Sequence, residues 1–275
     1  MLIEARHVAL DVTDMSHQVL IGRRRKLRIL KTVSLSIAKG ETVGIVGESG
    51  SGKTSLGRTL LRLYEPSEGQ LRFDGADITH ASAAALKPLR RRMQMIFQDP
   101  QSSLNPRHTI GGIIATALTL HGLDASRAAI AAILDRVGLP ASAMARYPHQ
   151  LSGGQRQRVG IARAISLKPD FVVADEIVSG LDVSTQAQVL DLLKGLRAEM
   201  GMALAFISHD LSVVRNLCDR VIIMKGGEIV EEGRTAEVFA SPRTDFTRTL
   251  IDSIPLPEIR PGWLDMTDRP SASQA

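Results

Sequence analysis

Short apolar runs alternate along the chain with longer segments in which apolar residues recur at helical spacing. Residues 41–46 form one such run and predict a buried strand. Residues 55–64 show helical spacing and stop before Pro66, which predicts a helix. A second helix is expected over 184–200, and further short apolar runs lie at 93–97, 171–174, 203–207 and 220–224. In the second half of the chain, the alternation of strands and helices implies a mostly parallel sheet covered on both faces, and therefore an α/β fold.

Two regions do not follow this alternation of strands and helices. Near the N-terminus, residues 2–10 and 33–37 predict strands separated by a polar, arginine-rich loop, and residues 69–75 alternate before an Asp-Gly turn signal. These pieces predict a small antiparallel sheet beside the parallel one. In the middle of the chain the signals are helical, as in the alanine-rich stretch 126–137, which ends before Gly138. A helical insertion into the sheet-forming part is therefore expected.

These patterns predict one domain over residues 1–254. Its core would comprise residues 1–98 and 164–240, with a helical subdomain inserted at about 99–163. Residues 255–275 are rich in proline and polar side chains, which is typical of a loosely ordered C-terminal tail. A total of 275 residues is enough to bury a substantial core.

Cysteine usage and hydropathy narrow the cellular setting. The single cysteine, Cys218, excludes an intramolecular disulfide and a multi-cysteine metal site, as is common in a reducing cytosol. The longest nearly apolar stretch, residues 110–120, is too short to span a bilayer. No basic segment followed by an apolar one opens the chain. We therefore expect a protein that is soluble by itself.

The net charge of +5 is concentrated in two basic runs, at 23–28 and 90–92. Such runs could contact nucleic acid or anionic lipid headgroups. A solvated loop and a solvated helix face are the favoured interpretation, because neither run is interleaved with aromatic residues. Nucleic acid is therefore not an expected partner.

Residues 47–54 fit the phosphate-binding pattern G-x-x-x-x-G-K-[ST] between an expected strand and an expected helix. Glycines permit a sharp turn whose N–H groups face one anion, and the N-terminus of the helix adds further donors. Lys53 would reach the β- and γ-phosphates of a nucleotide, and the Thr54 hydroxyl would ligate Mg²⁺. A chance glycine-rich turn of this pattern is expected in about one chain of this length in a hundred. The candidate contacts are Gly47, Glu48, Ser49, Gly50, Ser51, Gly52, Lys53, Thr54 and Ser55.

An acidic pair follows an apolar strand about 120 residues after the phosphate loop. Asp175 at the strand end can hold the shell of a Mg²⁺ ion. Glu176, one residue further on, is placed to polarise a water for attack on the γ-phosphate. Many strands end in an acidic turn, so the pair predicts a catalytic site only in combination with the preceding phosphate loop.

A second candidate anion site precedes a helix expected from residue 155 towards 167. A serine hydroxyl and two glycines at a helix start expose several N–H donors. Two phosphate-type sites with only one lysine-bearing loop favour a dimer in which one chain's second site closes on the other chain's nucleotide. The residues of this second site are Ser152, Gly153, Gly154 and Gln155, after Leu151.

With these elements in order, the sequence resembles the ATP-binding subunits of ABC transporters. The resemblance implies ATP and Mg²⁺ as cofactors and adds two residues to the site. Gln98 would bind Mg²⁺ and the attacking water and couple the site to a partner, and His209 would contact the γ-phosphate. In that family, the segment that matches residues 179–182 crosses the dimer interface.

Four stretches are similar to the oligopeptide, dipeptide and nickel importer branch of that family: 97–107, 147–158, 182–190 and 241–255, the last with Thr244-Asp245 where His-Pro is common. The resemblance implies a heteromeric importer of two integral-membrane permeases, two ATPases and an extracytoplasmic solute-binding protein. This chain would be one ATPase, peripheral at the cytoplasmic face of the inner membrane. The second ATPase would be a sibling or a copy. Closure of the ATPase pair on ATP would turn the permeases outward, and hydrolysis would reset them.

The sequence departs from the family in three places. The family stacks an aromatic ring on adenine, but residues 9–17 contain no Phe, Tyr or Trp, and only His17 or a nearby arginine could substitute. Ile177 stands where proline commonly follows the acidic pair and would loosen that turn slightly. Many branch members end in a cysteine-bearing extension, whereas no cysteine follows Cys218, so no iron–sulfur cluster is expected in the tail.

Several alternatives remain open from the sequence. A soluble ABC ATPase acting on nucleic acid or ribosomes usually has two phosphate loops or a long coiled-coil insertion, and this chain shows neither. A subunit that binds ATP without hydrolysing it is disfavoured by the intact Lys53, Glu176 and His209. Within the importer interpretation, peptides are the leading solute, and nickel comes next, before other metal chelates and opine- or sugar-like solutes.

Overall fold

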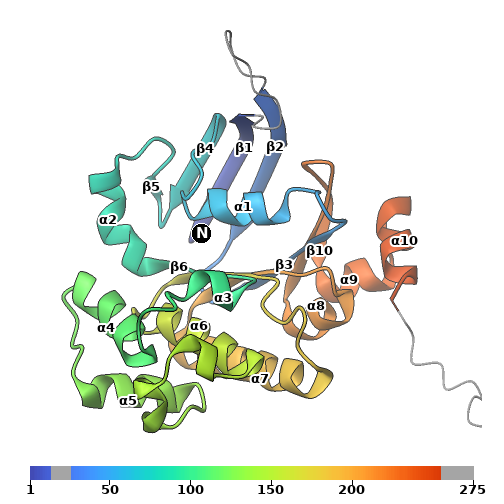
Figure 1. Cartoon of the computed structure of the whole chain (residues 1–275). Helices are drawn as coiled ribbons and strands as arrows, with labels where there is room; N and C mark the ends of the chain where they lie inside the picture. The colour runs from blue at the N-terminus through green and yellow to red at the C-terminus, as the bar shows by residue number, and fades with distance from the viewer. Residues whose placement is uncertain (14–25, 255–275) are drawn as a thin grey trace, which may run out of the picture.

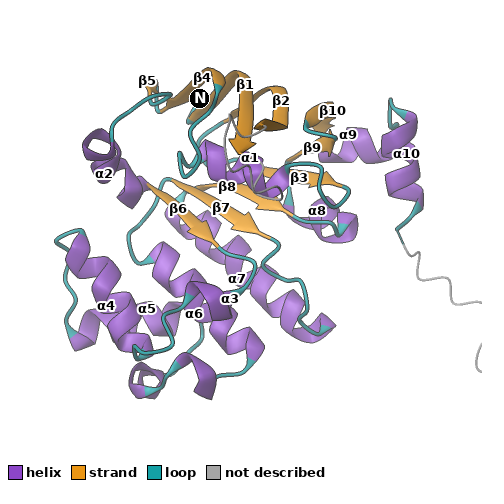
Figure 2. Ribbon diagram, turned by 45° about the horizontal axis from the view of Figure 1, so that its top comes forward, coloured by secondary structure: helices purple, strands orange, loops and turns teal. Residues whose placement is uncertain are grey.

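The computed structural model describes residues 1–13 and 26–254. The predicted tail at 255–275, most of the arginine-rich loop and His17 lie outside these described residues. Two sheets and the helices between and around them form the described part of the chain, which confirms the α/β fold (Figures 1 and 2). No helix of the described residues is long and apolar enough to cross a membrane.

A six-stranded sheet forms the centre, in the order β10-β9-β3-β8-β7-β6. Its neighbours pair in parallel except β9 and β10, which form an antiparallel edge. The mostly parallel sheet was thus predicted correctly, and the antiparallel edge strand was not. The strands are β3 (Thr42–Gly47), β6 (Met93–Ile96), β7 (Phe171–Asp175), β8 (Ala203–Ile207), β9 (Arg220–Lys225) and β10 (Glu228–Arg234).

The smaller sheet is antiparallel, as expected, with the order β2-β1-β4-β5. Strand β2 begins seven residues before the expected start at residue 33, so part of the expected loop is strand. Arg28 in this extension forms ion pairs with Asp11 and Glu68, which join β2 to β1 and β4. The strands are β1 (Ile3–Thr13), β2 (Lys26–Ile37), β4 (Glu68–Phe73) and β5 (Ala76–Asp77).

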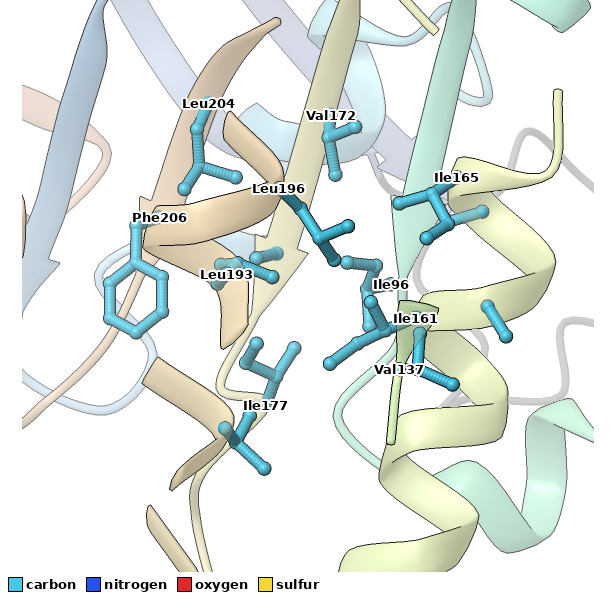
Figure 3. Packing of buried hydrophobic residues seen from close by; sticks show 14 of the residues in the cluster. Ile96, Val137, Ile161, Ile165, Val172, Ile177, Leu193, Leu196, Leu204 and Phe206 are labelled. Atoms are coloured by element: carbon cyan, nitrogen blue, oxygen red, sulfur yellow. The ribbon is translucent and has the colours of Figure 1, made fainter. Parts of the chain in front are cut away.

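Apolar side chains on both faces of the central strands explain why these strands are continuous apolar runs. In β7, Phe171 and Val173 belong to a cluster shared with α1 and the smaller sheet, whereas Val172 and Ala174 face a second cluster. Figure 3 shows this second cluster, in which Val172 lies near leucine and isoleucine side chains of α6 and α7. Strands buried on both faces are typical of a parallel sheet covered by helices.

Helix α1 (Lys53–Leu60) lies between the two sheets (Figure 2). The prediction that this helix continues to residue 64 is wrong. The chain leaves the helix at Arg62, which has a positive φ of 53° and donates a hydrogen bond of 2.7 Å to the Ile78 carbonyl. Gly57 permits the close packing of α1, because a Cβ there would lie 2.8 Å from Ile207 and Val173 side-chain carbons.

The helical insertion is present between β6 and β7. Ser126 caps α5 through its hydroxyl, and Gly138 follows the helix with a φ of 69°, as the sequence indicated. The predicted subdomain boundary near residue 163 falls inside α6. The elements are α3 (Pro100–Ser103), α4 (Ile110–Leu120), α5 (Arg127–Arg136), short 3-10 turns at Ala141–Ala145 and Pro148–Gln150, and α6 (Gly153–Ile165).

The basic run at 90–92 ends α2 (Ala83–Arg92) and is not a merely solvated helix face. Arg90 donates to the carbonyls of Leu61 and Arg62, and Arg92 donates to Asp170 and Asp74. These arginines therefore join α2 to neighbouring segments. The remaining helices are α7 (Val183–Met200), α8 (Leu211–Leu217), α9 (Thr235–Ala240) and α10 (Asp245–Asp252).

Candidate functional site

The predicted phosphate loop is the turn between β3 and α1, and its backbone is tightly constrained. Gly47 has a φ of 150°, and a Cβ on it would lie 2.1 Å from the Met224 carbonyl oxygen. Gly52 precedes the helix with a φ of 99° and provides no side-chain cap for the first N–H groups of α1. The first turn of α1 therefore presents N–H donors and the positive end of the helix dipole to the loop.

Two polar side chains of the loop fit an anionic ligand. Lys53 is only 6% exposed, and its ammonium donates 2.8 Å hydrogen bonds to the carbonyls of Gly47 and Glu48. Burial lowers the pKa of Lys53, although the nearby carboxylates of Glu176 and Asp175 oppose that effect. The Ser51 hydroxyl is buried and has no hydrogen-bond partner among the described residues. A buried cation and an unpaired hydroxyl are what a phosphate group would satisfy.

Thr54 and Asp175 come together at the start of α1 and the end of β7. The Thr54 hydroxyl donates a 2.9 Å hydrogen bond to Asp175 Oδ1. Asp175 is 2% exposed, and burial raises the pKa of its carboxyl group while the bond from Thr54 lowers it. A hydroxyl and a carboxylate are oxygen ligands of the kind that Mg²⁺ prefers. This pair therefore fits the predicted metal site.

Glu176 lies at the centre of the predicted catalytic residues. The Gln98 amide donates a 3.0 Å hydrogen bond to Glu176 Oε2, and His209 Nδ1 lies 3.4 Å from the same oxygen. Glu176 has a positive φ of 46°, and its N–H donates to the Ile207 carbonyl. Strained backbone of this kind clusters at functional sites in proteins. Two residues far apart in the sequence, Gln98 and His209, therefore meet on the carboxylate of Glu176.

The residue after Glu176 differs from the proline of the family but fits its surroundings. Ile177 is 1% exposed and packs into the second apolar cluster, the one that contains Val172 (Figure 3). The turn itself closes through a bond from Ser179 N–H to the Glu176 carbonyl. Whether Ile177 loosens this turn stays a prediction.

A cavity of about 380 Å³ lies over the phosphate loop and reaches Gln98 and Glu176. Asp175 is hydrogen-bonded to Thr54, and His209 lies 3.4 Å from Glu176. Both Thr54 and Glu176 line the cavity. The structure thus brings together the loop, both acids, Gln98 and His209. The described residues that line the cavity are Ile29, Ser49, Gly50, Gly52, Lys53, Thr54, Ser55, Gln98 and Glu176.

The second candidate anion site lies apart from this cavity. Ser152 accepts a hydrogen bond from the Gln155 N–H, and Gln155 accepts one from the Ser152 N–H. This reciprocal capping box starts α6. None of Ser152, Gly153, Gly154 and Gln155 is among the described residues that line the cavity.

The sequence did not predict two contacts at the site. Ile29 lines the cavity, but it belongs to the part of β2 that the sequence presented as a loop. The Gly227 N–H donates to the Ser51 carbonyl at 3.1 Å, which joins the β9–β10 turn to the phosphate loop. A Gly-Gly turn signal was present, but nothing in the sequence indicates its neighbour. Of the stretch 9–17, the described residues do not line the cavity, so the adenine contact stays unassigned.

Comparisons with known proteins agree with this geometry. A family model described as ABC transporter matches residues 30–179. The chain is similar to a putative peptide import ATP-binding protein of Brucella ovis, 51% identical over 86% of this chain and 75% of that protein. It is also similar to the oligopeptide transport ATP-binding protein OppF of Streptococcus mutans, 42% identical over 94% and 85%.

Solved structures resemble the fold over most of its length. The dimeric structure of a bacterial ABC transporter cassette matches with a TM-score of 0.75 and 30% identity, over 85% of this chain and 98% of that one. A post-hydrolysis dimer of the same cassette, bound to ADP and Pi, matches with a TM-score of 0.73 and 29% identity over the same shares. The chain belongs to the ABC transporter family, as one of its ATP-binding, ATP-hydrolysing cassettes.

Proposed function

We propose that this cassette hydrolyses Mg²⁺–ATP to drive the import of peptides through a membrane transporter. The observation that carries the proposal is the identity to proteins named as peptide or oligopeptide import ATP-binding proteins, 42–51% over most of the chain. A site in which Gln98 and His209 both meet Glu176, beside the bonded pair of Thr54 and Asp175, supports hydrolysis rather than binding alone.

Each residue has a proposed task at the nucleotide. Lys53 and the N–H groups of the loop and α1 bind the β- and γ-phosphates. Thr54 and Asp175, with Gln98 at the edge, would hold Mg²⁺, which supplies charge neutralisation on the phosphates. Further loop contacts come from Gly47, Glu48, Ser49, Gly50, Ser51, Gly52 and Ser55.

Glu176 is proposed as the general base. Its carboxylate accepts the proton of the attacking water, while Gln98, already hydrogen-bonded to it at 3.0 Å, orients that water. His209, which lies 3.4 Å from the same carboxylate, is proposed to contact the γ-phosphate. Positioning and electrostatic stabilisation account for most of the catalysis in phosphoryl transfer, which suits residues that share one carboxylate.

The proposed assembly contains two permeases, a second ATPase that is a sibling or a copy, and an extracytoplasmic binding protein. Separation of Ser152–Gln155 from this chain's own cavity supports a site completed by the second ATPase. Within this chain, residues 1–254 would form the ATPase domain, with a core of 1–98 and 164–240 and a helical subdomain at about 99–163. Peripheral placement at the cytoplasmic face of the inner membrane follows from this assembly.

The test is a tagged purification of this chain from native membranes, with every co-purifying protein identified by mass. Two permeases and a second ATPase are the expected partners, and the binding protein can then be screened with peptide and nickel ligands. Recovery of ribosomal or DNA-bound proteins without any membrane protein would overturn the importer assignment in favour of a soluble ABC ATPase.

A further inference from the structure

Arg163, near the end of α6, is a half-buried cation that has no task in the proposed mechanism. It forms no ion pair with a carboxylate of the described residues. Burial lowers the pKa of Arg163, but an arginine side chain stays charged in proteins. A half-buried charge without an opposite charge nearby is costly. The contacts that this guanidinium does make are therefore informative about why it is there.

The guanidinium of Arg163 contacts both ends of residues 97–103, the Gln98 segment. Its central carbon lies 5.6 Å from the centre of the ring of Phe97, the residue directly before Gln98. Its Nη1 donates a 2.6 Å hydrogen bond to the carbonyl of Ser103, the last residue of α3. A cation over an aromatic face and a hydrogen bond from a charged donor are both favourable, and more so where water is partly excluded. Arg163 therefore attaches the whole Gln98 segment to α6.

Between these two ends, Gln98 is exposed, and its amide donates a 3.0 Å hydrogen bond to the carboxylate of Glu176. Strand β6 ends at Ile96, so the central sheet fixes the chain only up to the residue before Phe97. A catalytic side chain keeps its geometry only when neighbouring contacts restrain the backbone that carries it. The approach of Gln98 to Glu176 therefore depends on what holds the Gln98 segment beyond the end of β6.

Helix α6 is a firm base for this attachment. Ile161, Ala162 and Ile165, which flank Arg163 in the sequence, are buried in the second apolar cluster. Ile96 at the end of β6 belongs to the same cluster, and Figure 3 shows it beside Ile161. Because interiors of this kind are close-packed, α6 and the end of β6 form one unit. From this unit, Arg163 reaches out to the Gln98 segment.

We propose that Arg163 is a positioning residue for Gln98, which it keeps within reach of Glu176 by holding both ends of the Gln98 segment. The inference rests on the tasks proposed above for Gln98 and Glu176. Arg163 acts through Phe97 and Ser103 and touches no reacting group. A displacement of about 1 Å in a catalytic group can reduce a rate by up to about a hundredfold. Loss of the guanidinium should therefore reduce turnover, with little effect on ATP binding at the phosphate loop.

The first measurement uses the isolated full chain and needs no activity. The side-chain amide resonances of Gln98 are recorded by NMR in wild type, Arg163→Met and Arg163→Lys, and a Gln98→Ala variant assigns them by their loss. Methionine keeps an unbranched side chain but removes the charge and the donors, whereas lysine keeps a cation. The expected result is a shift of the Gln98 resonances in Arg163→Met that Arg163→Lys partly restores.

Arg158→Met is the matched control. Arg158 is also a half-buried arginine of α6 that donates to a backbone carbonyl, but this carbonyl belongs to Val137 at the end of α5. The control should leave the Gln98 resonances in place. Equal shifts in Arg158→Met and Arg163→Met would indicate a general loosening of α6 and would overturn the inference.

The second measurement is ATP turnover by the assembled transporter that carries each variant. We expect kcat to fall about tenfold in Arg163→Met, with partial recovery in Arg163→Lys, while KM for ATP changes less than about twofold. Arg163→Gln, which is shorter and uncharged, should shift the same resonances and serves as the second variant if Arg163→Met fails to fold. Unmoved Gln98 resonances in a folded Arg163→Met or Arg163→Gln protein overturn the inference. Shifted resonances with unchanged kcat would support the positioning by Arg163 and contradict the proposed task of Gln98.

Discussion

Lys53 and Asp175 are the two buried charged residues to which we assign the phosphates and the Mg²⁺ ion of the nucleotide. Burial favours the neutral form of both groups, because it lowers the pKa of the lysine and raises the pKa of the aspartate. Each group is stabilised by local bonds, from Lys53 to two carbonyls and from Thr54 to Asp175. A phosphate would pair the Lys53 ammonium with an opposite charge, and a divalent cation would be coordinated by the oxygens of Thr54 and Asp175.

Replacement of Lys53 by alanine should weaken ATP binding and abolish turnover. A charge-assisted hydrogen bond contributes about 1.5–3 kcal/mol, which corresponds to about a ten- to hundredfold loss of affinity. Equilibrium binding of a fluorescent ATP analogue measures the first effect, and phosphate release measures the second. Lys87→Ala, an exposed lysine of α2, is the control. Wild-type turnover in Lys53→Ala would contradict the assignment of the phosphate loop.

Among single residues, the sequence predicted those whose chemistry has few other uses. Lys53, Asp175 and Glu176 were placed correctly relative to one another because a phosphate loop followed by an acidic strand end leaves few other arrangements. Ile29 was missed because an apolar residue in a basic segment has no chemical signature. The adenine contact stays unassigned, because none of the described residues of the stretch 9–17 lines the cavity.

At the scale of elements, the β3–α1 turn depends on backbone that a side chain would disrupt. Gly47→Ala combines an unfavourable φ with a Cβ placed 2.1 Å from the Met224 carbonyl, so β9 would have to move. We expect a loss of at least about 3 kcal/mol in the free energy of unfolding, measured with urea. Gly50→Ala also has a positive φ, but its Cβ would meet no atom within 4 Å, so it should cost only about 1 kcal/mol. Equal losses in the two variants would refute this steric account.

The attachment of α10 to β10 should depend on pH, because Glu231 in β10 accepts hydrogen bonds from the N–H groups of Arg243 and Thr244, just before α10. Burial acts to raise the pKa of Glu231, but these hydrogen bonds outweigh it and the pKa is lowered from its ordinary 4.5. The ionised carboxylate therefore stabilises the folded state fully above about pH 4.5. This contribution is lost as the pH falls below 4.5 through the folded-state pKa. Amide exchange of residues 243–252, corrected for the intrinsic pH dependence, should therefore rise below pH 4.5. In Glu231→Gln, which cannot ionise, this local rise should be absent, and its persistence would assign the effect to another group.

Elements were predicted well where burial is uniform and poorly where it is not. Strands β3, β7 and β8 are apolar on both faces, so their sequence leaves little choice of structure. The first part of β2 is largely exposed and basic, and cross-strand ion pairs of Arg28 stabilise it instead of an apolar pattern. Helix α1 ends early, and just beyond its end Arg62 donates a tertiary hydrogen bond to the Ile78 carbonyl, a contact that no local signal indicates.

At the scale of the whole molecule, the sequence predicted the layers but not the order of the strands within the central sheet. The mixed sheet places β3 between β8 and β9, so the phosphate loop lies next to the ends of strands that come far later in the chain. This arrangement brings Glu176, His209 and the β9–β10 turn together at the carboxyl ends of the parallel strands. Strand order depends on long-range packing, which apolar periodicity does not contain.

The position of Ser152 in the molecule predicts that its effect appears on a partner. Ser152→Arg adds bulk and charge at the start of α6, away from this chain's own cavity. In a pair with a sibling ATPase, hydrolysis should therefore be blocked at the sibling's nucleotide and retained at this chain's own. Photo-labelling with an ATP analogue, followed by separation of the two subunits, distinguishes the sites. Loss confined to this chain's own nucleotide would contradict a shared site.

Peptide uptake tests the central claim most directly. The assembled transporter is placed in vesicles with ATP on the cassette side and radiolabelled oligopeptide with the binding protein on the other. We predict ATP-dependent accumulation by the wild type and none by Glu176→Gln, which keeps the site able to bind ATP but removes the proposed base. Wild-type accumulation by Glu176→Gln, or accumulation that needs no ATP, would contradict the account.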